Sequence, residues 1–247
     1  MILIIFLAIL GITIGSFLNV LIYRIPRGES IVLPPSHCPN CNHQLGVLDL
    51  FPVFSYLWLG GRCRYCKTPI SWRYPLVELI TAVLTVICWI RFDLSIDGAM
   101  SLVLTYVLIA IAFIDLEHRL IPNVLTLPMI AIGLIFRGWQ GEIMAGILGG
   151  LIGGGLLFLV AFFYPKGMGM GDVKFLAMAG VFLGWEKALF LLFSGSFLGV
   201  LIIIPLMLLK KLDRKTAFPF GPFLVVGALI ALYWEEAVFY YYGFLGG

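Results

Sequence analysis

Residues 143–164 read IMAGILGGLIGGGLLFLVAFFY, an apolar stretch without a charged side chain. A stretch of about 20 apolar residues can cross the hydrocarbon core of a bilayer as an α-helix. The whole chain agrees with this stretch, because 62% of its 247 residues are hydrophobic, 12% are charged and the mean hydropathy is +1.07. A soluble domain carries about 25% charged residues. We therefore expect an all-α membrane protein, and the composition argues against a water-soluble enzyme, a disordered chain or an outer-membrane barrel.

Further apolar runs predict about eight transmembrane helices. The runs are 1–23, 75–90, 99–116, 122–136, 143–164, 173–184, 188–209 and 218–234. The run 173–184 is short, and alone it is also compatible with a re-entrant segment. If all eight runs cross, with the long polar segment in the cytoplasm, every Lys and Arg faces the cytoplasm except Arg91, Arg137 and Lys187. If 173–184 does not cross, the basic cluster at 210–215 moves outside, so the eight-span arrangement is preferred.

The same pattern predicts a division of the chain into three parts. Residues 1–23 are a first span, read as uncleaved because no basic residue precedes the apolar run. Residues 24–74 are a polar cytoplasmic loop, and residues 75–247 are a seven-span membrane core. No extended basic surface lies outside the short loops, so nucleic acid is not an expected partner. Glycines four residues apart, at 149/153 and 150/154, predict close packing between helices.

The polar loop contains four of the five cysteines, arranged as two CxxC pairs. They are Cys38, Cys41, Cys63 and Cys66. Four thiolates in two such pairs are typical of a closed, structural, tetrahedral zinc site. Disulfides or redox use are the alternative, which a reducing cytoplasm disfavours. His37 and His43 flank the first pair and are alternative ligands, while Cys88 lies alone in an apolar run and is interpreted as a packing residue.

Most acidic residues fall in loops or at interfaces, where solvated charge explains them. Three call for another explanation: Glu78, Asp115 and Asp172. Glu78 lies near the start of the second run, where it can pair with Arg73. Asp115 ends the third run and Asp172 opens the sixth, so both lie at the cytoplasmic face of the membrane, where ionisable groups suggest function. The alternative is that these two aspartates are interfacial charges paired with Arg119 and Lys174.

Two carboxylates that meet share a proton, so one can act as a general base toward water and the other as an acid. This is the chemistry of an aspartic protease. The glycine-rich approach to Asp172, with Gly167, Gly169 and Gly171, suits close approach of an extended substrate backbone.

Six motifs, in this order, resemble those of the type IV prepilin peptidases, members of the GxGD class of membrane aspartic proteases. They are GSFLNV at 15–20 with YRIP at 23–26, the double CxxC, YPLVEL at 74–79, Asp115 with IPN at 121–123, GMGDVK at 169–174, and FGP at 220–222. The resemblance covers most of the chain. It implies Asp115 and Asp172 as catalytic residues, with Gly169, Gly171 and Lys174 positioning the backbone or substrate.

The resemblance also implies an activity and its partners. Such enzymes remove the basic leader from prepilins and pseudopilins, the subunits of type IV pili and secretion systems, at the cytoplasmic side of the bacterial inner membrane. Members with the complete cysteine-rich loop also methylate the new N-terminal amine with S-adenosylmethionine. We therefore expect both activities and structural zinc. Glu78 is the candidate in methyl transfer, either to accept the amine proton or to orient the donor.

Two other classes of function compete with this reading. A proton-coupled membrane transporter would use intramembrane carboxylates as a relay, but it favours carboxylates near the midplane and repeated halves. A metal-sensing or scaffold membrane protein would explain the cysteines but leaves residues 169–172 without a role.

Overall fold

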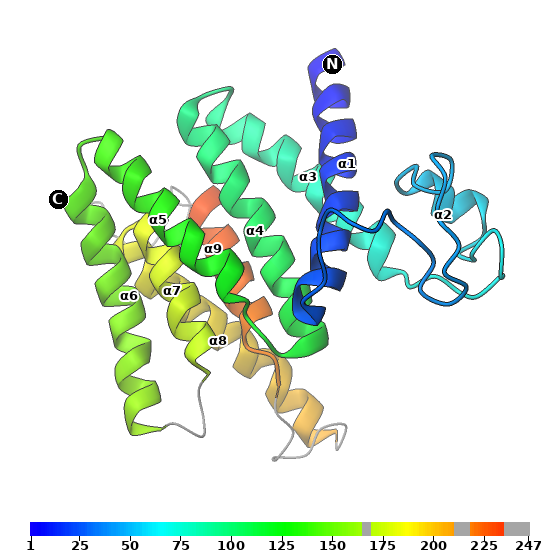
Figure 1. Cartoon of the computed structure of the whole chain (residues 1–247). Helices are drawn as coiled ribbons and strands as arrows, with labels where there is room; N and C mark the ends of the chain where they lie inside the picture. Colours follow the sequence, from blue (N-terminus) through cyan, green and yellow to red (C-terminus); the bar gives the residue numbers. More distant parts are fainter. Residues whose placement is uncertain (165–168, 210–217, 235–247) are drawn as a thin grey trace. The chain divides into compact units, whose positions relative to one another are not determined.

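A computed structural model describes residues 1–164, 169–209 and 218–234, and within these ranges it contains helices and no named strand (Figure 1). Some charged residues that the predicted topology places in loops lie outside the described residues: Lys166, the basic cluster at 210–215 and the acidic pair 235–236. The helices are α1 (Ile2–Arg24), the 3₁₀ helix η1 (Ile25–Arg27), α2 (Phe54–Trp58), α3 (Arg73–Phe92), α4 (Ile96–His118), α5 (Asn123–Trp139), α6 (Ile143–Phe163), α7 (Met170–Leu183), α8 (Trp185–Leu208) and α9 (Gly221–Tyr233).

Each of the eight apolar runs forms a helix. Within the described residues, five helices are long and apolar enough to cross a bilayer: α1, α3, α4, α6 and α8. The other three, α5, α7 and α9, have 17, 14 and 13 residues. The chain is therefore a multi-pass helical membrane protein. It consists of two compact units, Met1–Ala110 and Ile111–Gly247, whose boundary falls inside α4.

In the first unit, α1 and α3 lie antiparallel because small residues let their backbones approach. A Cβ atom on Gly11 would lie 2.6 Å from Ala82 Cα, and one on Gly15 would lie 2.6 Å from Glu78 Cα. Near the loop end of the pair, Asn19 Nδ2 donates a hydrogen bond of 3.0 Å to the Tyr74 carbonyl oxygen. This buried polar contact fixes the register of the two helices at their polar ends.

In the second unit, α7 is the central helix and packs against α5, α6, α8 and α9. Its residues from Phe175 to Leu183 are almost all buried. The glycine-rich face of α6 lies against it, as the spacing predicted: a Cβ on Gly149 would lie 2.1 Å from Gly180 O, and one on Gly180 would lie 2.2 Å from Gly149 O. Further along, Gly153 meets Leu176 O, so α6 and α7 run antiparallel.

Polar contacts join α5 to both ends of α7. At the N-terminal ends, Lys174 Nζ donates a hydrogen bond of 2.8 Å to Asn123 Oδ1. At the C-terminal ends, the Arg137 guanidinium donates to the carbonyl oxygens of Val181 (3.4 Å) and Phe182 (2.5 Å). Because like ends meet like ends, α5 and α7 are parallel. The cation also satisfies carbonyls that a helix C-terminus otherwise leaves unpaired.

Candidate active site and metal centre

Asp115 lies in the last turn of α4, directly after the fully buried Ile114, and is itself only 6% exposed. Its carboxylate has a specific partner: the backbone N–H of Gly221 donates a hydrogen bond of 2.9 Å to Asp115 Oδ2. Gly221 is the first residue of α9, and Phe220 at the N-cap provides no side-chain acceptor. The carboxylate of Asp115 therefore accepts a hydrogen bond from one of the free N–H groups of a helix N-terminus.

A side chain at position 221 would press on the carboxyl group of Asp115. A Cβ atom there would lie 2.7 Å from Asp115 Oδ2 and 3.0 Å from Asp115 Cγ. The FGP stretch at 220–222 is one of the six motifs in the sequence, but no role was predicted for Gly221. The available signal was the motif itself, because Gly followed by Pro at the start of an apolar run marks a helix N-terminus but not its partner.

Asp172 lies in the first turn of α7, after the N-cap residue Gly169, and is half-buried. Its carboxylate interacts electrostatically with that of Asp115. The structure therefore brings together the two aspartates that the sequence singled out. Two helix N-termini, those of α7 and α9, meet at this pair, and helix N-termini favour negative charge.

The three residues predicted to position backbone or substrate have different surroundings. A Cβ on Gly169 would lie 3.4 Å from Asp172 Oδ2, an ordinary contact distance, and the backbone of Gly169 donates a hydrogen bond to the Asp172 carboxylate. A Cβ on Gly171 would lie 3.0 Å from Ile121 Cβ, so Gly171 packs the start of α7 against the segment that precedes α5. Lys174 Nζ donates its hydrogen bond to Asn123 Oδ1. The alternative interpretation of the sequence had Lys174 forming an ion pair with one of the two aspartates.

The four loop cysteines form a cluster. Their Sγ atoms all lie within 4.8 Å of one another, and the Sγ atoms of Cys38 and Cys66 are 3.8 Å apart. In a tetrahedral zinc site with Zn–S bonds of about 2.3 Å, the sulfurs lie about 3.8 Å from one another. All five cysteines of the chain are free thiols, and neither His37 nor His43 is part of the cluster. The donor set therefore fits a metal that prefers four thiolates.

The two CxxC pairs are built as matching turns, a local repeat that the cysteine spacing alone does not reveal. The N–H of Cys38 donates to His43 O at 3.0 Å, and the N–H of Cys63 donates to Thr68 O at 2.9 Å. The residue after each pair has positive φ, 56° at Asn42 and 59° at Lys67. Each turn directs its two sulfur atoms toward the centre of the four-cysteine cluster. Asn40, in the first turn, links the two turns by donating a 2.7 Å hydrogen bond to Thr68 Oγ1.

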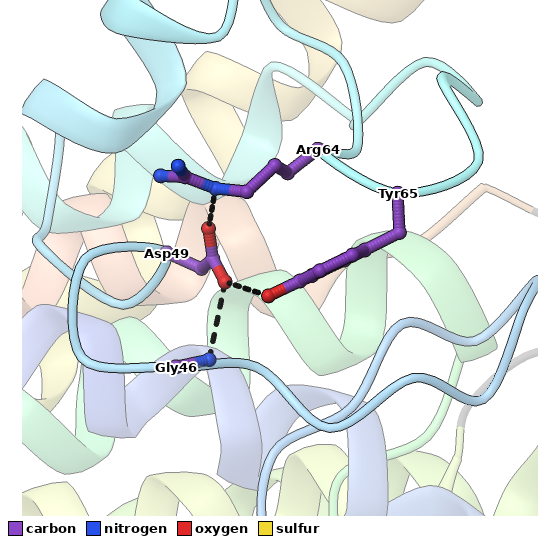
Figure 2. A network of polar contacts seen from close by, with 4 residues as sticks. All are labelled: Gly46, Asp49, Arg64 and Tyr65. Atoms are coloured by element: carbon purple, nitrogen blue, oxygen red, sulfur yellow. Dashed lines mark hydrogen bonds and ion pairs between the residues drawn. The ribbon is translucent and has the colours of Figure 1, made fainter.

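A network centred on Asp49 holds the loop beside this cluster (Figure 2). The Asp49 carboxylate accepts hydrogen bonds from Arg64 Nε (2.5 Å), Tyr65 Oη (3.0 Å) and the N–H of Gly46 (3.1 Å). Burial acts to raise the pKa of Asp49, but these donors outweigh it and hold the pKa below its ordinary value. Because Arg64 and Tyr65 lie between Cys63 and Cys66, the network anchors the second CxxC turn.

Comparison with known proteins identifies the family of this chain. Residues 102–204 match the type IV leader peptidase family, and residues 9–92 match the bacterial peptidase A24 N-terminal domain. The chain is 36% identical over 263 residues to the prepilin leader peptidase/N-methyltransferase of Aeromonas hydrophila, covering 94% of this chain and 91% of that protein. This chain belongs to the type IV leader peptidase family.

Other members of the family give the same result. The prepilin leader peptidase/N-methyltransferase of Pseudomonas aeruginosa is 34% identical over 261 residues, with 93% of this chain and 90% of that protein covered. The protein of the same description from Myxococcus xanthus is 39% identical over 211 residues, with 83% and 63% covered. No solved structure matches significantly. The family does not support the transporter alternative.

The two family matches separate the candidate residues into two groups along the chain. The stretch 102–204 contains both aspartates, and the stretch 9–92 contains the four cysteines and Glu78. Glu78 is 6% exposed and accepts a 2.7 Å hydrogen bond from the N–H of Val53, the residue before α2. Val53 has φ 61°, an unfavourable value for a β-branched residue. Glu78 therefore fixes the loop to α3 at a strained point of its backbone.

Proposed function

We propose that this chain is a membrane aspartic endopeptidase that removes the leader from type IV prepilins or pseudopilins and N-methylates the new N-terminal residue. The observation that carries the peptidase is the meeting of Asp115 and Asp172, from the end of α4 and the start of α7, in a member of the type IV leader peptidase family. The descriptions of the relatives support the methyltransferase.

Peptide hydrolysis at such a pair proceeds through proton transfers. The ionised carboxylate removes a proton from water while the water oxygen attacks the scissile carbonyl carbon, and the protonated partner donates its proton to the carbonyl oxygen. When the tetrahedral intermediate collapses, the C–N bond breaks, the nitrogen takes a proton from the dyad, and a leader carboxyl and a free amine are released. Gly169, Gly171 and Lys174 are proposed to position the backbone or the substrate beside Asp172.

The eight-span arrangement, with both aspartates at the cytoplasmic face of the inner membrane, is part of this proposal. It comprises a first span at 1–23, a cytoplasmic loop at 24–74 and a seven-span core at 75–247. The parallel course of α5 and α7, with the antiparallel α6 between them, supports α7 as a crossing helix. The distribution of Lys and Arg supports the orientation. A basic leader before a hydrophobic helix then has its scissile bond at the dyad.

For the loop, we propose structural zinc held by Cys38, Cys41, Cys63 and Cys66. Zinc ligation would supply free energy to a loop with few buried apolar side chains. Methyl transfer requires S-adenosylmethionine, which supplies an electrophilic methyl group. Glu78 is the residue proposed to take a proton from the amine nitrogen or to orient the donor, and the bound donor would supply the methyl group to that nitrogen.

The proposal is tested with purified protein, a prepilin-like substrate and intact-mass detection, with and without S-adenosylmethionine. The wild type should remove the leader and, with the donor, add one methyl group. Asp115→Ala and Asp172→Ala should each abolish cleavage at unchanged thermal stability, while Asp97→Asn, a change of an exposed aspartate on α4, should cleave normally. If either alanine variant still cleaved the substrate, the assignment of Asp115 and Asp172 as the catalytic pair would be wrong. If the protein were instead a metal-sensing or scaffold membrane protein, the Asp172→Asn variant should keep its function.

Glu78→Gln separates chemistry from anchoring at that position. The amide oxygen of glutamine still accepts the Val53 N–H bond, so the loop should keep its conformation, but the side chain no longer takes a proton. We expect leader removal to continue and methylation to fall by about 10-fold or more. Normal methylation by this variant would leave Glu78 with the anchoring role alone.

A further inference from the structure

The loop between α1 and α3 exposes large apolar side chains on and beside the short helix α2. Phe54, Leu57 and Trp58 share one face of this helix, and all three are exposed, Trp58 at 88%. The exposed ring of Phe51 extends this face, because its centroid lies 5.6 Å from that of Phe54. These four side chains, Phe51, Phe54, Leu57 and Trp58, are called the loop patch. Contiguous exposed apolar patches mark surfaces that meet a partner or a membrane.

A hydrogen bond places the loop patch at the level of a membrane span. The N–H of Val53, the residue before α2, donates at 2.7 Å to the carboxylate of Glu78 on α3. The helix α3 is long and apolar enough to cross a bilayer, and Glu78 lies about 7.5 Å along its axis from its first residue, Arg73. Because helical side chains lean toward the N-terminus of their helix, the nitrogen of Val53 lies between these two levels. The helix α2 therefore begins beside the first turns of a span.

The packing of α1 gives the same level. A Cβ on Gly15 would lie 2.6 Å from Glu78 Cα, and the side chain of Ser16 hydrogen-bonds to Glu78. Gly15 lies in the middle of α1, about 13 Å from the end that joins the loop. Phe17 and Leu79, next to these contacts, are exposed apolar side chains on the two spans. Glu78 and the loop backbone bonded to it are therefore level with side chains that lipid surrounds.

The charges near the loop patch suit a membrane surface. Residues 50–61 contain no charged side chain, and the carboxylate of Asp49, just before them, is paired with Arg64. The patch can therefore enter lipid without removing a free charge from water. Arg62 and Lys67, which follow it, are exposed cations that complement anionic phospholipid headgroups. Trp58 belongs to the residue type that is enriched where headgroups meet acyl chains.

We propose that the loop patch inserts into the bilayer at the boundary between headgroups and acyl chains, and so anchors the loop to the membrane. The occupant of the patch is phospholipid, because both spans that hold the loop already place it at lipid level, and apolar faces of interfacial helices lie at this depth. The inference goes beyond the proposed function and does not depend on it. The anchor keeps the second CxxC turn, which follows α2, at the membrane surface.

The first test uses Trp58 as a probe of depth. Tryptophan fluorescence of the full chain is recorded in nanodiscs of plain phospholipid and of phospholipid brominated near the headgroup end or near the centre of the acyl chains. The difference between the wild type and Trp58→Phe isolates the emission of this indole from that of the other tryptophans. We expect bromine near the headgroup end to quench Trp58 more strongly than bromine at the chain centre, and aqueous acrylamide to quench it little.

Two results would overturn the anchor, both read without substrate. Quenching of Trp58 by acrylamide but not by bromine would place the patch in water, including the case in which an added prepilin-like substrate then shields it. Protection from both quenchers would mean that protein covers the patch, and the mass of the complex would then show whether a second copy of this chain does so.

The second test asks whether the patch itself holds the loop in lipid. Leu57→Glu places a charge on the exposed face of α2, and Gln44→Glu adds the same charge at an exposed position elsewhere in the loop. Each is measured with and without Trp58→Phe, and the Tm confirms folding. Leu57→Glu should lose most of the bromine quenching of Trp58 and gain acrylamide quenching, because a charge in the acyl region is costly. Gln44→Glu should match the wild type.

Bromine quenching in a folded Leu57→Glu protein as strong as in the wild type would overturn the anchoring role, because the rest of the fold would then hold Trp58 at its depth. The quenching measurements need no active enzyme. Failure of the wild type to cleave a prepilin-like substrate would therefore overturn the proposed function and leave the anchor standing.

Discussion

Among single residues, Asp49 carries the clearest pH dependence outside the membrane. Its pKa is depressed in the folded loop, so its contribution to stability is present above the ordinary pKa of an aspartate, about 3.9, and is lost as the pH falls through the depressed value. We expect Asp49→Asn to destabilise the loop at pH 7 by about 1 kcal/mol, because Arg64 is 43% exposed and solvent weakens that ion pair.

The measurement is the temperature at which the loop cysteines become reactive toward a thiol reagent. At pH 7 the variant should react at a lower temperature than the wild type, and the two should converge as the pH falls through the depressed pKa. Glu29→Gln, a change of an exposed acid in the same loop, should behave as wild type at every pH. A difference that persists in acid would mean that Asp49 acts by packing rather than by charge.

Single residues also show what sequence can and cannot predict. Asp115 and Asp172 were identifiable because acidic residues are rare at the ends of apolar runs, and the cysteines because of their spacing. The partners Gly221 and Val53 were not identifiable. Each contributes a backbone N–H, and a backbone group has no sequence signature; its contact with a carboxylate 106 or 25 residues away arises only when helices pack.

At the level of helices, the glycine face of α6 determines how closely α7 is held. Gly149→Ala would place a methyl group 2.1 Å from the Gly180 carbonyl oxygen, so the helices must separate. Overpacking of this kind costs about 1–3 kcal/mol. Gly155→Ala is the matched control on the same helix, because nothing lies within 4 Å of a Cβ there and alanine favours a helix over glycine by up to about 1 kcal/mol.

Thermal unfolding in detergent should therefore move in opposite directions for the two variants. Gly149→Ala should unfold at a lower temperature than the wild type and lose cleavage in proportion, since α7 carries Asp172. Gly155→Ala should unfold at the same or a higher temperature. A Gly149→Ala protein as stable as the wild type would contradict the packing of α6 on α7.

The helices were also the part of the fold that hydrophobicity predicted best. Every apolar run contains a helix, and the glycine spacing at 149/153 correctly predicted a packing face. The loop was predictable only in its cysteines. Its turns depend on positive φ at Asn42 and Lys67 and on hydrogen bonds inside each turn, and these follow from convergence of the four sulfurs rather than from local preference.

For the whole molecule, the four cysteines lie in one unit and the two aspartates in the other. We expect Cys38→Ser to lose zinc and to lower abundance or methylation, while the protein that accumulates still cleaves the leader. Metal content per chain, methylation and cleavage should be measured together. Cys88→Ser is the control, because it removes a buried thiol that is not in the cluster and should keep the metal. Wild-type abundance with normal methylation in Cys38→Ser would contradict a structural metal.

The shortness of α7 has a consequence for how the second unit, whose centre it forms, fits the bilayer. Its 14 residues span about 21 Å, whereas the hydrocarbon core of a bilayer is about 30 Å thick. Arg137 fixes the C-terminal end of α7, which the proposed arrangement places outside the cytoplasm, so the hydrophobic mismatch of the short helices α5, α7 and α9 would fall on the end of the second unit that bears Asp172. Bilayers of short-chain lipid should expose that end to water, and long-chain lipid should draw it into the acyl region. Cleavage in nanodiscs should therefore slow as acyl chains lengthen, making membrane thickness a determinant of peptidase rate.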